Sequence, residues 1–395
     1  MLRYILLSAA GALGLMLVCY LLNNAEKKPV GIMDWKTRQF TKFEKNGLYR
    51  FDKEYEKSII DSALFVDVSS TKTLINNQTV VTDRKVLLDF LKLIKDVDYR
   101  YIILDVFFSA NDTTEYDAEL IDTLLRMNRI AIAKDYDPDG EAEPIININL
   151  RKIAFYDSWL VSPDSKLFKT YPYFLGGELT LAAALYEKTT GHSIKKVGCF
   201  YFDGCHLVNK DPFITFHCLD MGTMDYIDRI VSDTYSAADF REGAEGKYII
   251  VGNFSDDEHY TYQGIQYGPS IHWTANRYFT AGKARVHPMY ALFLFLLYTA
   301  IIYCILQQKS LIDFVISKVK LNRFDNNLLF SLLRPFFYLL LSFLSYSVLL
   351  LIVCLVLYWA FDIPYNYQPP VVVFSFLKQF KQFNVKQKNI DEYES

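Results

Sequence analysis

The order of apolar and polar positions between residues 62 and 135 predicts alternating strands and helices. Three short apolar runs, SALFVDVSS (62–70), YRYIILDVFFS (99–109) and NRIAIAKD (128–135), are typical of buried strands. In the stretches between them, RKVLLDFLKLIKD (84–96) and AELIDTLLRM (118–127), apolar residues recur at helical spacing. Strands that alternate with helices at this short spacing predict a parallel α/β sheet.

The expected elements also include an N-cap for the first helix, two further helices and further β segments, of which the strand at Tyr248 closes the domain. Asp83 precedes the first helix and is the expected N-cap residue. A helix is expected over Gly177 to Thr189, and a further short helix around Ile271 to Thr280. The remaining apolar segments favour β structure, and they are Lys195 to Leu207, Asp211 to Cys218 and the buried strand Lys247 to Gly252.

Three uncharged apolar runs are long enough to cross a bilayer core of about 30 Å. They are Tyr4 to Leu22, Pro288 to Leu306 and Phe336 to Phe361. The first run is either an uncleaved anchor or a cleaved signal peptide. The anchor is favoured because the run exceeds a usual signal-peptide core, and because Asn23 and Asn24 stand where small residues precede cleavage.

Charge between the last two runs predicts the orientation of the chain. The loop 307–335 contains five basic and two acidic residues. A short basic loop between spans belongs on the cytoplasmic side, so residues 24–285 are expected outside the cytoplasm. We therefore expect a multi-pass protein of the bacterial inner (cytoplasmic) membrane, with this domain in the periplasm or outside the cell.

The pattern divides the chain into four parts. Residues 1–23 are the N-terminal transmembrane anchor, and residues 24–285 are the extracytoplasmic domain, which begins with a charged, aromatic stretch that includes a candidate helix from Glu44 to Ile60. Residues 286–362 hold two transmembrane helices, 288–306 and 336–361, with the basic loop between them. Residues 363–395 are a short tail. Three spans would place this tail outside, whereas its lysines favour the inside after a short fourth membrane segment starting near Ile363, and this alternative stays open.

Composition and cysteine usage exclude some function classes. The chain has 395 residues and a net charge of −3, and its outer domain has no basic patch with interleaved aromatics, so nucleic-acid binding is not expected. Three of the six cysteines lie in the apolar runs. Of the other three, Cys199 and Cys205 are either joined by a disulfide in an oxidising compartment or are free buried thiols, and the sequence leaves both open.

Catalytic and cofactor motifs are missing from the sequence. It contains no GxxxxGK[ST] or GxGxxG phosphate loop, no GxSxG nucleophile elbow and no HExxH metal motif. We therefore expect a protein that is not an enzyme and binds no cofactor. A metal or hydrolytic site from Asp256, Asp257, His259 and His272 has suitable ligand types. A solvated acidic loop is the simpler interpretation, so no metal is predicted.

Polar residues that follow the predicted strands form the candidate ligand-binding site. Ligands of open parallel sheets bind beyond the carboxyl ends of the strands. Three candidates end strands, two follow on a loop into a helix, and three follow the last strand, and together they are Asp67, Asp105, Asn253, Asp112, Asp117, Asp256, Asp257 and His259. In the alternative interpretation, Asp67 and Asp105 cap helices or hold loops by accepting backbone N–H bonds.

Three blocks of the chain resemble the second-type CHASE domain, an extracellular sensory module associated with cyclases and histidine kinases. They are FVDVS (65–69), YIILDVFFSANDTTEYDAEL (101–120) and GKYIIVGNFSDDEHYTYQGIQYGPSIHWTANRYFTAG (246–282). The resemblance covers roughly residues 24–360 and implies an extracytoplasmic three-layer α/β sensory domain followed by a small transmembrane helix bundle. The chain departs from the family in having Gly268-Pro269 where members have Pro-Gly, and in having only a short tail where members carry a cytoplasmic output domain.

These expectations combine into a membrane-anchored extracytoplasmic sensory or receptor module. Such a module would bind an unidentified extracytoplasmic ligand or envelope protein and would signal through its membrane helices to a separate cytoplasmic effector protein. The alternative is a non-enzymatic structural or docking component of a membrane complex. The lipid bilayer is an expected partner, nucleic acid is not, and self-association into a homodimer is left open.

Overall fold

The chain folds into two compact units. The helical unit comprises Met1–Tyr49 and Val286–Ser395, and the α/β unit comprises Arg50–Arg285. The computed structural model describes residues 2–23, 61–75, 79–109, 113–135, 147–157, 160–161, 168–212, 224–261, 264–309, 328–361 and 368–394. The candidate helix from Glu44 to Ile60, nearly all of the expected β segment from Asp211 to Cys218, and Asp112 lie outside these residues.

A six-stranded sheet forms the centre of the α/β unit. Its strand order is β14-β1-β15-β4-β5-β6, and every neighbouring pair is parallel. The strands in this order are Asp225–Tyr226, Ala63–Asp67, Tyr248–Gly252, Tyr101–Leu104, Ile130–Lys134 and Ala154–Tyr156. The parallel α/β sheet predicted from the sequence is therefore confirmed.

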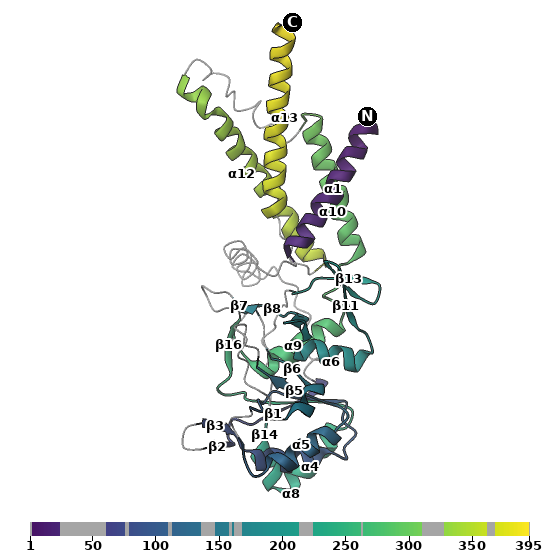
Figure 1. Ribbon diagram of the computed structural model, residues 1–395, viewed down its shortest axis with the longest axis vertical. Coiled ribbons are helices and arrows are strands. Elements are labelled where there is room, and N and C mark those ends of the chain that lie inside the picture. The colour runs from purple at the N-terminus through teal and green to yellow at the C-terminus, as the bar shows by residue number, and fades with distance from the viewer. Residues whose placement is uncertain are drawn as a thin grey trace. The chain divides into compact units, whose positions relative to one another are not determined.

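Helices cover both faces of this sheet (Figure 1). One face packs against α4 (Arg84–Ile94), α5 (Asp117–Arg126), α7 (Ile227–Ser232) and α8 (Thr234–Ala244). The other packs against α6 (Leu181–Thr190) and α9 (Gly268–Thr280). Alternate side chains of the central strands enter opposite cores, so β15 and β4 are apolar and buried along their whole length, as is usual for parallel sheets with both faces covered.

The ends of two helices test the sequence expectations. Asp83 caps α4, since its side chain accepts hydrogen bonds from the backbone N–H groups of Lys85 and Val86 at 2.9 and 3.1 Å. Helix α6 begins at Leu181, so the expected start at Gly177 was wrong. Gly176 and Gly177 have φ values of 55° and 90° and form the turn of a hairpin between β9 (Phe174–Leu175) and β10 (Glu178–Leu179).

The remaining strands form small antiparallel ribbons. The β segment expected over Lys195 to Leu207 is a three-stranded meander of β11 (Ile194–Val197), β12 (Phe200–Asp203) and β13 (His206–Val208). The other pairs are β2 (Lys72–Ile75) with β3 (Thr79–Thr82), β7 (Leu160–Val161) with β8 (Phe168–Thr170), and β16 (Glu258–Thr261) with β17 (Gly264–Tyr267). A 3-10 helix, η1 (Ile148–Lys152), precedes β6.

The meander also separates two cysteines. Cys199 and Cys205 are exposed, free thiols. They flank the four-residue strand β12, which spans roughly 13 Å at the rise of an extended chain. A disulfide requires Cα atoms closer than about 7 Å, so this arrangement favours the free-thiol alternative, although the thiols are not buried.

Helix α9 approaches the sheet closely at Gly252, the last residue of β15. A Cβ atom at this position would lie 2.3 Å from Cγ of Pro269 and 3.1 Å from Cβ of Asp105. Only glycine therefore allows the first turn of α9 to rest on the strand end.

We expect Gly252→Ala to destabilise the α/β unit by about 1 to 3 kcal/mol, because the added methyl group must push α9 away from β15. Hydrogen exchange of the β15 amides in the detergent-solubilised full chain measures this loss. Gly243→Ala is the matched control, since its Cβ would meet only Cδ1 of Leu64, at 3.9 Å. If the β15 amides exchange at the same rate in the two variants, the close approach of α9 to Gly252 is contradicted.

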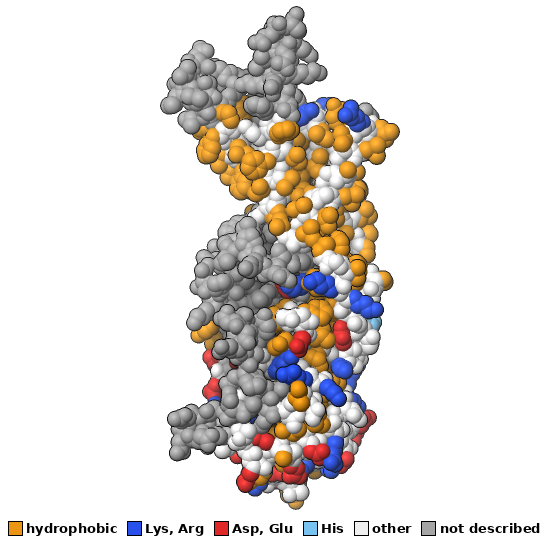
Figure 2. Space-filling view, viewed as in Figure 1, with side chains coloured by type: hydrophobic (Ala, Val, Ile, Leu, Met, Phe, Trp, Pro, Cys, Tyr) orange, Lys and Arg blue, Asp and Glu red, His pale blue; other side chains and the backbone are white. Residues whose placement is uncertain are grey.

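The described part of the helical unit contains four helices, α1 (Leu2–Asn23), α10 (Pro288–Leu306), α12 (Leu328–Phe361) and α13 (Gln368–Glu394). Among the residues that the structure describes, three segments are long and apolar enough to cross a membrane, Leu2–Leu22, Pro288–Leu306 and Pro335–Leu357. Large apolar side chains are exposed along these helices, and Figure 2 shows them over the described part of this unit. The expected three apolar helices are thus present, which indicates a membrane protein.

The C-terminal tail contains the long helix α13. Its residues Val371 and Phe374 are buried in the same apolar cluster as Tyr298 of α10 and Leu350 of α12. Helix α13 is not among the three candidate membrane spans of the described chain. Its apolar run ends at Lys378, where charged residues begin, and is too short to cross a membrane. Val371 and Phe374 are therefore apolar because they pack in this cluster.

Candidate ligand site

Asp67 holds two loops together at the end of β1. Its fully buried carboxylate accepts hydrogen bonds from the backbone N–H groups of Ser69, at 2.9 Å, and of Phe254, at 3.1 Å. It also accepts bonds from the hydroxyls of Ser69 and Ser255 at 2.7 and 3.2 Å. Four donors occupy the two oxygens, so the geometry matches the loop-holding alternative, and a ligand-binding role for Asp67 has no support from it.

Asn253 and Asp256 shape the loop after β15. The side-chain oxygen of Asn253 accepts hydrogen bonds from the N–H groups of Ser255 and Asp256 at 3.0 and 2.9 Å, which is an Asx turn. Asp256 pairs with Lys72 of β2 at the surface. The hydrogen bond and the charge of Lys72 lower the pKa of Asp256. Both candidates therefore stabilise the loop.

Asp117 lies away from this loop, at the first residue of α5. It is buried beside Arg84, whose Nε is 3.9 Å from Oδ1 of Asp117. The Arg84 guanidinium donates a hydrogen bond to the Phe107 carbonyl at 2.9 Å and lies 4.5 Å from the Phe108 ring centroid. These contacts place Asp117 in a buried structural pair.

Asp105 belongs to a buried polar cluster with two residues outside the predicted set, Asp157 and His272. Asp105 directly follows β4, Asp157 directly follows β6, and His272 lies near the start of α9. Nε2 of His272 contacts Oδ1 of Asp157 and lies 3.8 Å from Oδ2 of Asp105. One oxygen or nitrogen from each residue lies within 4.8 Å of those of the other two. We call Asp105, Asp157 and His272 the acidic–histidine cluster.

The cluster is almost closed to solvent. The exposed fractions of the side chains are 0% for His272, 4% for Asp105 and 11% for Asp157. Nδ1 of His272 lies 2.5 Å from the hydroxyl of Tyr171, which also accepts a hydrogen bond from the Ala182 N–H at 3.2 Å. Tyr171 therefore orients the imidazole with Nε2 towards the two carboxylates.

Burial and neighbouring charges strongly affect Asp105. Burial raises its pKa well above the usual value, and the nearby carboxylates of Asp157 and Asp257 raise it further. Asp257 and Asp105 approach the first turn of α9. A Cβ on Gly268 would lie 1.9 Å from Oδ2 of Asp257 and 3.4 Å from Oδ2 of Asp105. The helix N-terminus offsets part of the charge repulsion.

The raised pKa of Asp105 predicts a pH-dependent stability. The groups around its carboxyl are Asp157, Asp257, His272 and, through its charge interaction, Tyr171. The native state holds the Asp105 proton more tightly than the unfolded state, so stability falls as pH rises from the unfolded pKa, about 3.9, through the higher folded pKa.

We expect Asp105→Asn to reduce this loss, so that the variant gains stability relative to the wild type as pH rises through that window. Denaturant unfolding at a series of pH values, with EDTA present to remove bound cations, measures the difference. Asp256→Asn is the control, because Asp256 is exposed and its pKa is lowered. Parallel pH profiles for the wild type and Asp105→Asn would contradict the prediction.

The structure thus separates the predicted site residues into different places. Asp105 joins the acidic–histidine cluster, and Asp257 approaches it and pairs with His259 at 2.6 Å. Asp67, Asn253 and Asp256 hold loops, Asp117 pairs with Arg84 at the start of α5, and Asp112 lies outside the described residues. Sequence reasoning missed Asp157, although AFYD repeats the strand-then-Asp pattern of ALFVD and YIILD. It considered His272 only together with the acids of the loop after β15.

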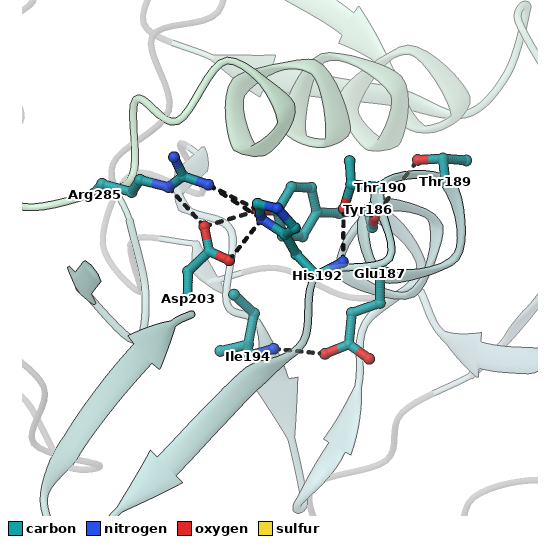
Figure 3. A network of polar contacts seen from close by, with 8 residues as sticks. All are labelled: Tyr186, Glu187, Thr189, Thr190, His192, Ile194, Asp203 and Arg285. Atoms are coloured by element: carbon teal, nitrogen blue, oxygen red, sulfur yellow. Dashed lines mark hydrogen bonds and ion pairs between the residues drawn. The ribbon is translucent and has the colours of Figure 1, made fainter. Parts of the chain in front are cut away.

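A second polar network surrounds Asp203, which is only 3% exposed (Figure 3). Its carboxylate accepts hydrogen bonds from Arg285 Nε at 2.7 Å and from the Tyr186 hydroxyl at 2.8 Å, and Nδ1 of His192 lies at 3.2 Å. Arg285 is the last residue of the α/β unit. The network therefore fixes the point where the chain leaves this unit.

Comparisons with known proteins add no relative. No family model, no curated protein and no solved structure matches this chain. The resemblance to the second-type CHASE domain therefore stays a prediction.

Proposed function

We propose that the protein is a membrane-anchored receptor whose α/β unit binds a ligand at the acidic–histidine cluster. The observation that carries this proposal is the nearly complete burial of Asp105, Asp157 and His272 at the carboxyl edge of the sheet. Ligands of open parallel sheets bind at this edge. Burying ionisable groups costs stability, so such clusters are often retained for binding.

The path from this site to the membrane follows the chain. His272 belongs to α9, which ends at Thr280, and the apolar helix α10 begins at Pro288. Between them, Arg285 is held by Asp203. A ligand that binds more tightly to one position of α9 would shift the short segment that connects α9 to α10. The size of the response is limited by the difference in ligand affinity between the two states.

In this proposal the α/β unit lies outside the cytoplasm of a bacterial cell. The basic segment 307–335, whose last residues belong to α12, would then face the cytoplasm and contact a separate effector protein, as its charge suggests. Signal output would come from that effector, and the chain itself would catalyse no reaction.

The two exposed thiols test the location. A membrane-impermeant maleimide added to intact spheroplasts should label the wild type more than a Cys199→Ser, Cys205→Ser double variant, because both thiols belong to the α/β unit. Labelling that differs only after the cells are lysed would place this unit in the cytoplasm and contradict the proposal.

Recovery of the effector tests signalling. Crosslinking in cells followed by purification in mild detergent should recover a cytoplasmic protein with the wild type, and less of it with Lys318→Glu, Lys320→Glu. The receptor proposal further requires that His272→Gln changes this recovery, whereas Tyr235→Ala, at an exposed position of α8, does not. If His272→Gln leaves recovery unchanged, the protein is a docking component instead.

A further inference from the structure

We propose that the acidic–histidine cluster binds a divalent metal ion through one oxygen each of Asp105 and Asp157 and through Nε2 of His272. This inference rests on the proposed function in one respect, since it names the ligand class of the same site. It differs from the sequence expectation of no metal, which considered the exposed loop acids rather than this cluster.

The spacing of the three ligand atoms suits one ion. Two atoms that each lie about 2.1 Å from the same ion are at most about 4.2 Å apart. Nε2 of His272 and Oδ2 of Asp105 are 3.8 Å apart, and Nε2 contacts Oδ1 of Asp157. All three atoms lie within 4.8 Å of one another, so small side-chain rotations would complete the set.

A buried acceptor within the cluster points to a ligand. Oδ2 of Asp105 is buried and makes no hydrogen bond. Its side chain is 4% exposed, and Oδ2 faces His272. A buried carboxylate oxygen without a hydrogen bond is costly. A cation between the three side chains would supply the missing interaction.

Charge balance favours the same occupant. Two ionised carboxylates and a neutral imidazole have a net charge of −2, which a divalent ion cancels. Without an ion, the carboxylates repel one another in a site of low dielectric constant, which is why the neighbouring acid raises the pKa of Asp105. Metal binding would hold both carboxylates in the ionised form.

Tyr171 contacts the ring nitrogen of His272 that would not bind the ion. Histidine ligands usually bond through their second ring nitrogen to a neighbouring group, which fixes the ring. The Tyr171 hydroxyl lies 2.5 Å from Nδ1 of His272, and the two rings pack edge to face at 5.6 Å. When Nε2 binds the ion, Nδ1–H donates to the Tyr171 oxygen.

Mixed oxygen and imidazole ligands favour a first-row transition ion over Mg²⁺ or Ca²⁺. Carboxylates suit Mn²⁺, whereas imidazole suits Zn²⁺ and Fe²⁺. Three protein ligands leave positions for water, as in open metal sites. We therefore expect Mn²⁺ and Zn²⁺ to bind more tightly than Mg²⁺.

Titration of the full chain tests this site. The protein in mild detergent is treated with EDTA, freed of chelator and titrated with MnCl₂ alone by calorimetry and electron paramagnetic resonance. We expect one Mn²⁺ per chain, with nitrogen coupling from His272 in the resonance spectrum. His272→Gln should lose that coupling and at least tenfold in affinity, and Tyr171→Phe should lose about 10- to 100-fold.

The controls separate binding from folding. His206→Gln is the matched histidine variant, since His206 is an exposed residue of β13 in the same unit, and it should keep full affinity. Hydrogen exchange of β15 shows whether each variant is folded. Binding of Mn²⁺ that is equal in the wild type and a folded His272→Gln variant, or absent from the wild type, would overturn the inference.

The outcomes also distinguish this inference from the proposed function. If Mn²⁺ binds as expected but neither EDTA treatment nor His272→Gln changes recovery of the effector, the metal is structural and the receptor proposal fails. If no ion binds and His272→Gln still changes recovery, the receptor proposal stands with a different ligand.

Discussion

Trp273→Ala should lower the free energy of unfolding of the α/β unit by about 3 to 5 kcal/mol. The indole is fully buried and packs on Tyr248 of β15, with ring centroids 4.6 Å apart. It fills the core between α9 and the sheet. Its removal leaves a cavity that neighbours such as Ile250, held in a strand, can fill only in part. Faster hydrogen exchange of the β15 amides would measure the loss.

Tyr235→Ala is the control for this prediction. It also removes a large aromatic ring, but Tyr235 of α8 is 83% exposed, so its loss should change stability by less than about 0.5 kcal/mol. If the β15 amides exchange at the same rate in Trp273→Ala and Tyr235→Ala, α9 does not stabilise the sheet as described.

Asp117→Leu should have an effect of similar size, about 3 to 5 kcal/mol, because it removes one partner of a buried ion pair. Arg84 and Asp117 have side chains that are 1% and 9% exposed. The double variant Arg84→Met, Asp117→Leu should recover most of the loss, since it removes both charges from the core. Denaturant unfolding of the four proteins of this cycle measures the coupling.

Asp122→Leu is the matched control, with the same substitution on the same helix. Asp122 forms an exposed pair with Arg126 at 2.7 Å, and such pairs contribute about 0 to 1 kcal/mol. A small effect for Asp117→Leu would show that the pair is solvated, and no recovery in the double variant would show that the carboxylate acts through Thr114 rather than Arg84. The N–H of Thr114 also bonds to Asp117.

The sequence predicted the central elements because their signals are local. Continuous apolar runs such as Tyr248–Gly252 occur where both faces of a strand are buried. Asp83 was recognisable as a cap because a cap lies directly before its own helix. The error at Gly177 arose because strand β10, which separates the glycine turn from the alanine-rich α6, has only two residues and is too short to give a strand pattern.

The candidate site was less predictable because it depends on strand order. Asp105 and Asp157 are far apart in the chain and meet because β4 and β6 flank β5. His272 reaches them only through the close contact of α9 with Gly252. No local sequence pattern shows the order of strands in a sheet. From the strand ends alone, Asp67, Asp105 and Asn253 were therefore predicted to share one site.

Short strands at both borders of the sheet affect how folded molecules interact with one another. The outermost strands, β14 and β6, have only two and three residues. A short border offers few backbone groups with which a strand of another molecule can pair, and this limits edge-to-edge aggregation. We infer that this sheet resists intermolecular strand addition even at high local concentration, which helps a protein whose apolar helices concentrate it in a membrane.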